Sequence, residues 1–144
     1  KGAQKMIIEP GMVGEKTHVV QETDTARMGG GATLPPVFST PRMISLMEQT
    51  AHSVVLPHLQ EGQTSVGMSV NIRHLGATPV GVEVRFRAEL LEVDGRRLRF
   101  KVEAWDPVEK IGEGEHERFI IDKDRFEARL DKKRQQLNGT IQER

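Results

Sequence analysis

The segment V-N-I-R-H begins as an alternating strand and ends in His74. Val70 and Ile72 share a face with this histidine, and continuing the alternation backwards adds Val66 and Met68 to that face. A histidine at the end of an apolar stripe can be a hydrogen-bonded structural residue or a base at the rim of a buried pocket. Because the reference pKa of histidine is about 6.5, it suits proton transfer near neutral pH. The pattern leaves both interpretations open.

Two further side chains could act with a histidine: the hydroxyl of Thr40 and the carboxyl of Glu48. Thr40 precedes Pro41 and is predicted to cap a helix that starts at this proline. A hydroxyl at a helix N-terminus lies beside free N–H groups and the positive dipole end, where a developing oxyanion is stabilised. Glu48 lies on the polar arc of the same helix. Its alternative role is an exposed pair with His52 at i+4.

The composition excludes several classes of site and partner. The chain has 144 residues, a length typical of one domain, and no cysteine for a disulfide, a thiolate metal site or a nucleophile. The 21 Lys and Arg balance the 21 Asp and Glu, which argues against a nucleic-acid binder. His18, His52 and His58 show no metal-ligand spacing, so we predict no metal.

We expect a cytoplasmic protein with no membrane partner. No apolar run approaches the roughly 20 residues that a membrane helix needs, and no signal-peptide pattern is present. Residues 6–137 are interpreted as a single domain and residues 138–144 as a C-terminal tail. Residues 1–5 precede a methionine and are interpreted as an appended segment outside the domain.

The elements that would position these side chains follow from the periodicity. A weakly alternating strand over 16–23 precedes a loop rich in Gly and Pro, and a loop of this length often serves as a lid or binding segment. A helix from Pro41 to about Leu56 has an apolar arc near 180°, wider than a surface helix requires. We therefore expect a sheet to wrap this helix.

From residue 64 onward the period switches to two. The alternating runs are 66–74, 80–92, 97–105 and 115–122. Each has one apolar face, which is typical of an antiparallel sheet with one covered side, and Asp94-Gly95 predicts a hairpin turn. After Asp122 the pattern becomes helical. The chain is therefore predicted to be an α+β layer pair.

Several segments together resemble a known family. They are V-F-S-T-P (37–41), Glu48 eight residues after Thr40, S-V-G (65–67), R-H-L-G-A-T-P-V-G (73–81) and I-G-E-G-E-H-E-R-F (111–119). In this order and at these spacings, they resemble the fluoroacetyl-CoA thioesterase-like branch of the hot-dog fold thioesterases, from about residue 12 to about 130. The resemblance implies a five-stranded antiparallel sheet wrapped round one long central helix, here followed by a C-terminal helix.

The resemblance also implies the site and its chemistry. Thr40, Glu48 and His74 correspond to the catalytic residues of that family, and Gly67 and Arg118 to its substrate contacts. The implied activity is hydrolysis of an acyl-CoA to a carboxylic acid and CoA, without a cofactor because CoA is part of the substrate. Homodimers with active sites at the subunit interface are typical of the family. Either Thr40 attacks the thioester, or Glu48 and His74 direct a water.

The loop before Thr40 departs from the fluoroacetyl-specific members, which carry phenylalanines there. Here the segment G-G-G-A-T-L-P-P has Leu34 as its only large apolar residue. We therefore expect a general short- or medium-chain acyl-CoA as substrate, with Leu34 and Phe38 as candidate acyl contacts. The alternative from another class is a non-catalytic acyl-CoA-binding module, a sensor or sink.

Overall fold

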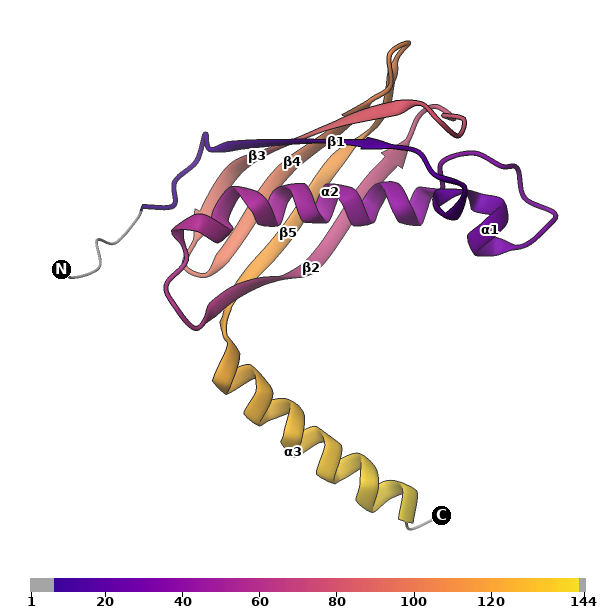
Figure 1. The fold of residues 1–144 in the computed structure, drawn as a ribbon. Helices are drawn as coiled ribbons and strands as arrows, with labels where there is room; N and C mark the ends of the chain where they lie inside the picture. Colours follow the sequence, from indigo (N-terminus) through magenta and orange to yellow (C-terminus); the bar gives the residue numbers. More distant parts are fainter. Residues whose placement is uncertain (1–6, 143–144) are drawn as a thin grey trace.

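The computed structural model describes residues 7–142, so the interpretation of residues 1–5 as an appended segment lies outside the described range. The strands are β1 (Val13–Val19), β2 (Gln63–His74), β3 (Glu83–Asp94), β4 (Arg97–Trp105) and β5 (Lys110–Asp122). The helices are α1 (Ala26–Gly30), α2 (Thr40–Val55), α3 (Lys123–Gln142) and the 3-10 turns η1 (Glu22–Asp24) and η2 (Leu56–His58). All strands form one antiparallel sheet in the order β1-β3-β4-β5-β2 (Figure 1).

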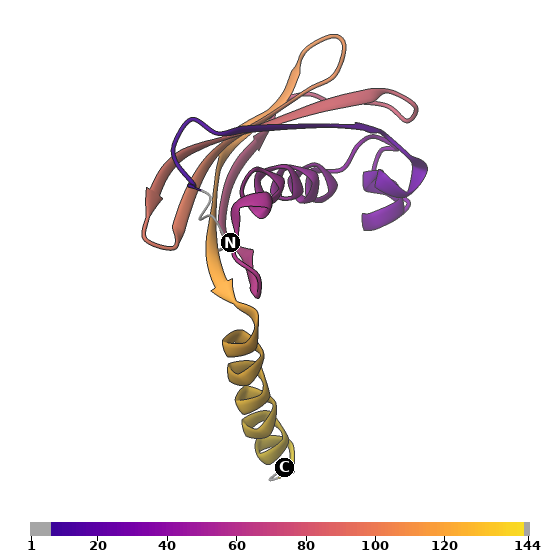
Figure 2. The ribbon, with the colours of Figure 1, turned by 60° about the vertical axis from the view of Figure 1, so that its left-hand side comes forward.

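The sheet curls round α2, which lies against its concave face (Figure 2). The helix buries Met43, Leu46 and Met47 in a core shared with Phe86 and Phe100 of the sheet. Burial of one wide helical face explains the apolar arc read from the sequence. The predicted hot-dog arrangement is confirmed.

The start of α2 differs from the prediction. Ser39, rather than Thr40, is the N-cap: its backbone is extended, and its hydroxyl accepts the Arg42 N–H at 3.1 Å. Thr40 is the first helical residue and Pro41 the second, so the prediction of Thr40 as the cap was wrong. Because Ser39 satisfies the amide at this helix end, the Thr40 hydroxyl is available for another contact.

The first strand was also predicted too far along the chain. It runs over Val13–Val19 rather than 16–23. The chain leaves the sheet before residue 22 because the Asp24 carboxylate accepts the Gln21 amide at 2.7 Å and closes the turn η1. This local side-chain bond competes with strand pairing.

A bulge interrupts β2 next to Gly67. Between Gly67 and Ser69 the register against β5 shifts, with one residue more on β2 than on its partner strand. Because side chains alternate along a strand, an extra residue moves the following ones to the other face. Val66 therefore does not share the face of His74, and that part of the prediction was wrong.

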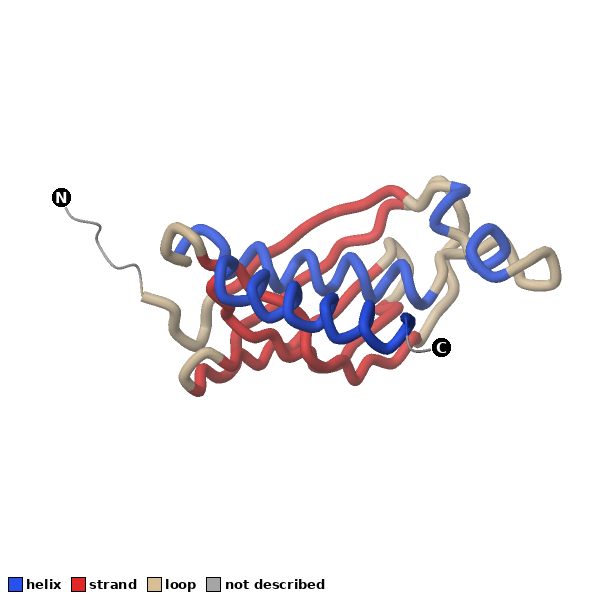
Figure 3. The backbone as a smooth tube through the Cα atoms, turned by 90° about the horizontal axis from the view of Figure 1, so that it is seen from below, coloured by secondary structure: helices blue, strands red, loops and turns tan. Residues whose placement is uncertain are grey.

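Helix α3 leaves the end of β5 and extends away from the sheet (Figures 1 and 2). In the view from below, the chain direction of α3 is roughly opposite to that of α2 (Figure 3). The predicted tail, 138–144, is helical as far as Gln142. Within residues 7–142, no helix is both long and apolar enough to cross a membrane.

Candidate active site

The first residue of α2 and the last residue of β2 meet at one end of the helix. Thr40 Oγ1 lies 2.7 Å from His74 Nδ1, although the two residues are 34 positions apart in the chain. The Thr40 side chain is exposed and His74 is half-buried. Fold topology thus brings a hydroxyl and an imidazole into the contact of an activated nucleophile and its base.

The environment of His74 favours the neutral imidazole. Burial lowers its pKa below the ordinary value of 6.5, and the backbone of Gly76 only partly offsets this effect. Among residues 7–142, its second ring nitrogen, Nε2, has no hydrogen-bond partner. A neutral ring with its proton on Nε2 can accept the Thr40 O–H at Nδ1.

The amides of the first turn of α2 are mostly occupied. Pro41 has no N–H, and the amides of Arg42 and Met43 donate to the side chain and the carbonyl of Ser39. In this turn the Thr40 amide remains for an anion. It lies at the positive end of the helix dipole, beside the Thr40 hydroxyl.

A cavity of about 430 Å³ opens beside Thr40 and His74. Its lining residues are Ala26, Pro35, Val37, Phe38, Ser39, Thr40, His74, Leu75, Gly76 and Ala77. Phe38, a candidate acyl contact, is fully buried and contributes to this wall. Leu34 is absent from the lining, because its side chain turns back over Gly30 of α1.

A second cluster surrounds Gly67. A Cβ atom on this glycine would lie 3.3 Å from His116 Cε1, 3.5 Å from Glu48 Oε1 and 3.6 Å from Arg118 Nη1. The structure therefore brings together three predicted site residues from α2, β2 and β5. The alternative pair between Glu48 and His52 is not formed, since His52 Nδ1 contacts the Ser65 hydroxyl at 2.7 Å instead.

Arg118 is a buried cation with only 7% of its surface exposed. It donates from Nε to Ser65 Oγ at 2.7 Å, from Nη2 to the Ser65 carbonyl at 2.8 Å and from Nη1 to His116 Nε2 at 3.1 Å. Burial lowers the pKa of Arg118, and the charge of Glu48 opposes this shift. His116 was not among the site residues predicted from the sequence. Its position two residues before Arg118, on the same strand face, was the available signal.

The two clusters occupy different stretches of one helix. Thr40 and Glu48 are eight residues apart, so their Cα atoms lie about 12 Å apart along the α2 axis. Within one chain, the Thr40–His74 pair and the cluster of Glu48, Gly67 and Arg118 are thus separate.

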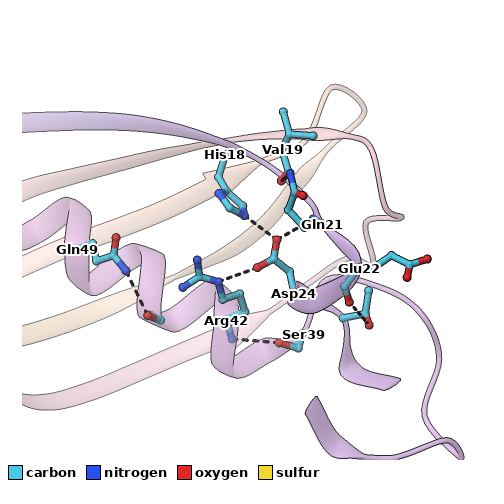
Figure 4. Close-up of polar contacts among 10 residues, drawn as sticks. His18, Val19, Gln21, Glu22, Asp24, Ser39, Arg42 and Gln49 are labelled. Carbon is cyan, nitrogen blue, oxygen red and sulfur yellow. Dashed lines mark hydrogen bonds and ion pairs between the residues drawn. The ribbon is translucent and has the colours of Figure 1, made fainter. Parts of the chain in front are cut away.

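A buried carboxylate anchors the start of α2 (Figure 4). Asp24 is only 4% exposed and accepts hydrogen bonds from Arg42 Nε at 2.8 Å and His18 Nε2 at 2.7 Å, besides that from the Gln21 amide. Burial alone would raise the pKa of Asp24, but these hydrogen bonds outweigh it and hold the pKa below 3.8. The anchor ties β1 and η1 to the helix turn that carries Thr40, and sequence reasoning missed it.

No metal site accompanies these clusters in the part of the chain that the structure describes. Among residues 7–142, no group of three or more His, Cys, Asp or Glu residues could hold a metal ion. The polar side chains that line the cavity are those of Ser39, Thr40 and His74.

Known proteins are similar to this chain in sequence and fold. The model of the fluoroacetyl-CoA-specific thioesterase family (FlK) matches residues 20–124. A fluoroacetyl-CoA thioesterase of Streptantibioticus cattleyicolor is 41% identical over 102 residues, 71% of this chain and 73% of that protein. A crystal structure of a fluoroacetyl-CoA-specific thioesterase mutant has a TM-score of 0.85 at 36% identity, covering 90% of this chain and 99% of that one. A thioesterase superfamily member from Thermus thermophilus has a TM-score of 0.85 at 29% identity, covering 92% and 98%.

Proposed function

Because the chain belongs to the fluoroacetyl-CoA-specific thioesterase family, we propose that it hydrolyses acyl-CoA thioesters to carboxylic acids and free CoA. The family expected from the sequence motifs is confirmed. The observation that carries the proposed activity is the 2.7 Å contact between Thr40 Oγ1 and His74 Nδ1 at the mouth of a cavity. A half-buried histidine bonded to a hydroxyl, in surroundings that favour its neutral form, has the geometry of general-base activation.

This contact favours the covalent route over direct attack by water. Thr40 Oγ attacks the thioester carbonyl carbon while its proton passes to His74 Nδ1. The Thr40 amide stabilises the resulting oxyanion. The C–S bond then breaks, and the CoA thiolate takes the proton from His74. In the second half, His74 deprotonates a water that attacks the acyl-threonine ester, and the returning proton restores the Thr40 hydroxyl.

We assign Glu48, Gly67 and Arg118 to the opposite wall of a site shared between two copies of the chain. Glu48 lies about 12 Å along α2 from Thr40, and Gly67 and Arg118 lie beside Glu48, so we assign the two clusters to different subunits of one site. β2 is a twelve-residue edge strand with Met68 and Val70 about half exposed, which favours pairing with a second copy. A twofold axis at this edge would face the Thr40 end of one helix towards the Glu48 segment of the other.

The proposed substrate is a short- or medium-chain acyl-CoA. The cavity beside Thr40 is lined by small and apolar groups, and its large aromatic wall residue is Phe38. Leu34, which stands in the loop where fluoroacetyl-specific members carry phenylalanines, is turned away from the cavity. A lining of this kind supports acceptance of an alkyl chain rather than tight selection for one fluorine atom.

The reaction needs only water as a second substrate, so we propose that no cofactor takes part. We place it in the cytoplasm, since a chain without cysteine suits a reducing compartment and CoA esters are intracellular metabolites.

Free-thiol release from a series of acyl-CoAs, from acetyl and fluoroacetyl to decanoyl, tests the activity. We expect turnover by the wild type and at least about a hundredfold loss in His74→Ala, since general-base catalysis contributes about 10²–10⁴. His58→Gln, in the turn η2, is the matched control and should retain full activity. Equal rates in the wild type and His74→Ala would exclude His74 as the base. Binding of acyl-CoA without turnover would contradict the proposed enzyme activity and support the alternative, a non-catalytic acyl-CoA-binding module.

A further inference from the structure

His116 lies between two groups whose hydrogen-bonding roles are fixed. Its Nδ1 is 2.8 Å from the carbonyl oxygen of Ser69, and its Nε2 is 3.1 Å from Nη1 of Arg118. A carbonyl oxygen only accepts and a guanidinium only donates. The ring must therefore carry its proton on Nδ1 and present a lone pair at Nε2. Both contacts are satisfied at once only by the neutral Nδ1–H tautomer.

The bulge in β2 supplies the first of these contacts. Ser69 follows the register shift after Gly67, and its carbonyl reaches the ring of His116 on the neighbouring strand. The ring also stacks on Phe100 of β4, with 6.5 Å between the two ring centroids, and His116 is only 1% exposed. The Ser69 carbonyl and the packing against Phe100 therefore fix the orientation of the His116 ring independently of Arg118.

Three of the five N–H groups of Arg118 are used by Ser65 and His116. The remaining two belong to Nη1 and Nη2, and Nη1 lies 3.6 Å from the position that a Cβ of Gly67 would occupy. We propose that His116 is a positioning residue for Arg118: by accepting the Nη1–H, it holds the guanidinium so that its free N–H groups face the acyl site beside Gly67. The kinetic consequences of this inference rest on the proposed thioesterase function. The tautomer of His116 and its contact with Arg118 do not depend on that function.

The charges around His116 act in both directions. Arg118 on the same strand disfavours a protonated ring, whereas Glu48 of α2 and Glu117 of β5 favour it. Burial is the largest effect, and the pKa of His116 is lowered below 6.5. Protonation at acid pH would place an Nε2–H against the Nη1–H of Arg118 and release the guanidinium from this contact.

The tautomer can be measured without any turnover. In ¹⁵N NMR spectra of the whole protein at pH 7.5, His116 should show a protonated Nδ1 and an unprotonated Nε2. Arg118→Met should shift the Nε2 resonance and raise the pKa of His116, because a neighbouring cation is removed. A ring with its proton on Nε2 would overturn the proposal whether or not the protein hydrolyses acyl-CoA.

The kinetic test is a double-mutant cycle with acyl-CoA as substrate. His116→Leu should lower kcat/KM by about 10- to 100-fold, the effect of losing a hydrogen bond to a charged group. When Arg118 is already replaced by Met, His116→Leu should alter kcat/KM by less than about twofold. The reason is that His116 acts through Arg118, and the free-energy effects of two coupled residues are not additive. His116→Gln, which offers an amide oxygen to Arg118, should recover most of the activity. Equal losses in both backgrounds would overturn the proposal.

If His116→Leu does not fold, the pH profile of His116→Gln decides. On the acid side, the plot of log kcat/KM against pH should be steeper for the wild type than for His116→Gln. The difference corresponds to one additional protonation, since the glutamine does not titrate. Identical acid slopes in the two proteins would contradict a positioning role for His116.

Discussion

The Thr40 hydroxyl contacts His74 Nδ1 at 2.7 Å, and it is free to do so because the neighbouring Ser39 caps α2. Two adjacent residues with similar hydroxyls thus have separate tasks. Ser39 satisfies a backbone amide, and Thr40 presents its oxygen to a half-buried imidazole. The division follows from the backbone, which is extended at Ser39 and helical at Thr40.

Ser39→Ala should therefore affect mainly stability, and Thr40→Ala mainly activity. Loss of the cap in Ser39→Ala should lower the free energy of unfolding by about 1 kcal/mol. Thr40→Ala should lose less stability and abolish acyl-enzyme formation. Urea denaturation and mass spectrometry after a short substrate pulse measure the two effects. A larger stability loss in Thr40→Ala than in Ser39→Ala would contradict the assignment of the cap.

Gly67→Ala should reduce activity far more than stability. The new methyl group would enter the space between His116, Glu48 and Arg118: its contacts with Glu48 and Arg118 are ordinary, and the ring of His116 must shift by a few tenths of an ångström. We expect a loss of at least about tenfold in kcat/KM, equivalent to 1.4 kcal/mol of transition-state binding. Gly139→Ala on α3 is the control, since a Cβ there meets nothing within 4 Å. Unchanged kinetics in Gly67→Ala would remove this glycine from the site.

Asp24→Asn should loosen the start of α2. The neutral amide loses the charge that attracts Arg42 and His18, and hydrogen bonds to charged groups contribute about 1.5–3 kcal/mol each before solvent screening. Because Arg42 and His18 are partly exposed, we expect a total loss nearer 1–2 kcal/mol, with a lower kcat. Glu61→Gln, at an exposed turn, should change neither quantity. Wild-type stability in Asp24→Asn would show that the anchor is dispensable.

Stability should fall on mild acidification. Burial lowers the pKa values of His52, His74 and His116 below 6.5, so the unfolded chain binds more protons than the folded one in this range. Their contribution is complete above about pH 7 and is lost as the pH falls from about 6.5 through the folded pKa values. Asp24, with its pKa lowered from 3.8, adds nothing to this change.

Urea midpoints measured from pH 8 to pH 5 test this expectation. The decline should be smaller in His116→Gln than in the wild type, because one of the three titrating rings is removed. A midpoint that stays constant or rises towards pH 5 would contradict the burial of neutral histidines.

Periodicity and turn chemistry predicted the elements well where local rules dominate. The strand over 97–105 follows from alternation after the Asp94-Gly95 turn, and the span of α2 follows from its apolar arc and from Pro41 near its start. The family motifs added Thr40, His74, Glu48, Gly67 and Arg118, and the structure gathers these into two clusters.

The sequence could not show interactions that depend on a single extra residue or on distant partners. The β2 bulge reverses the faces on either side of Gly67, which a strict period of two cannot represent. The Asp24 anchor joins residues 18, 24 and 42 through a turn whose geometry exists only in the fold. The contact of His116 with Arg118 was not predicted, because it depends on Arg118 being buried beside the ring.

Mixing two inactive variants gives the most direct test of a site built from two subunits. Thr40→Ala and Glu48→Gln damage different halves of each proposed site, so a mixed dimer would keep one intact site and lose the other. With random assortment, half of the dimers are mixed, and we predict recovery of about a quarter of wild-type thiol release. If Thr40 and Glu48 instead serve the same site within one chain, the mixture will release no more thiol than either variant alone, and the shared site is excluded.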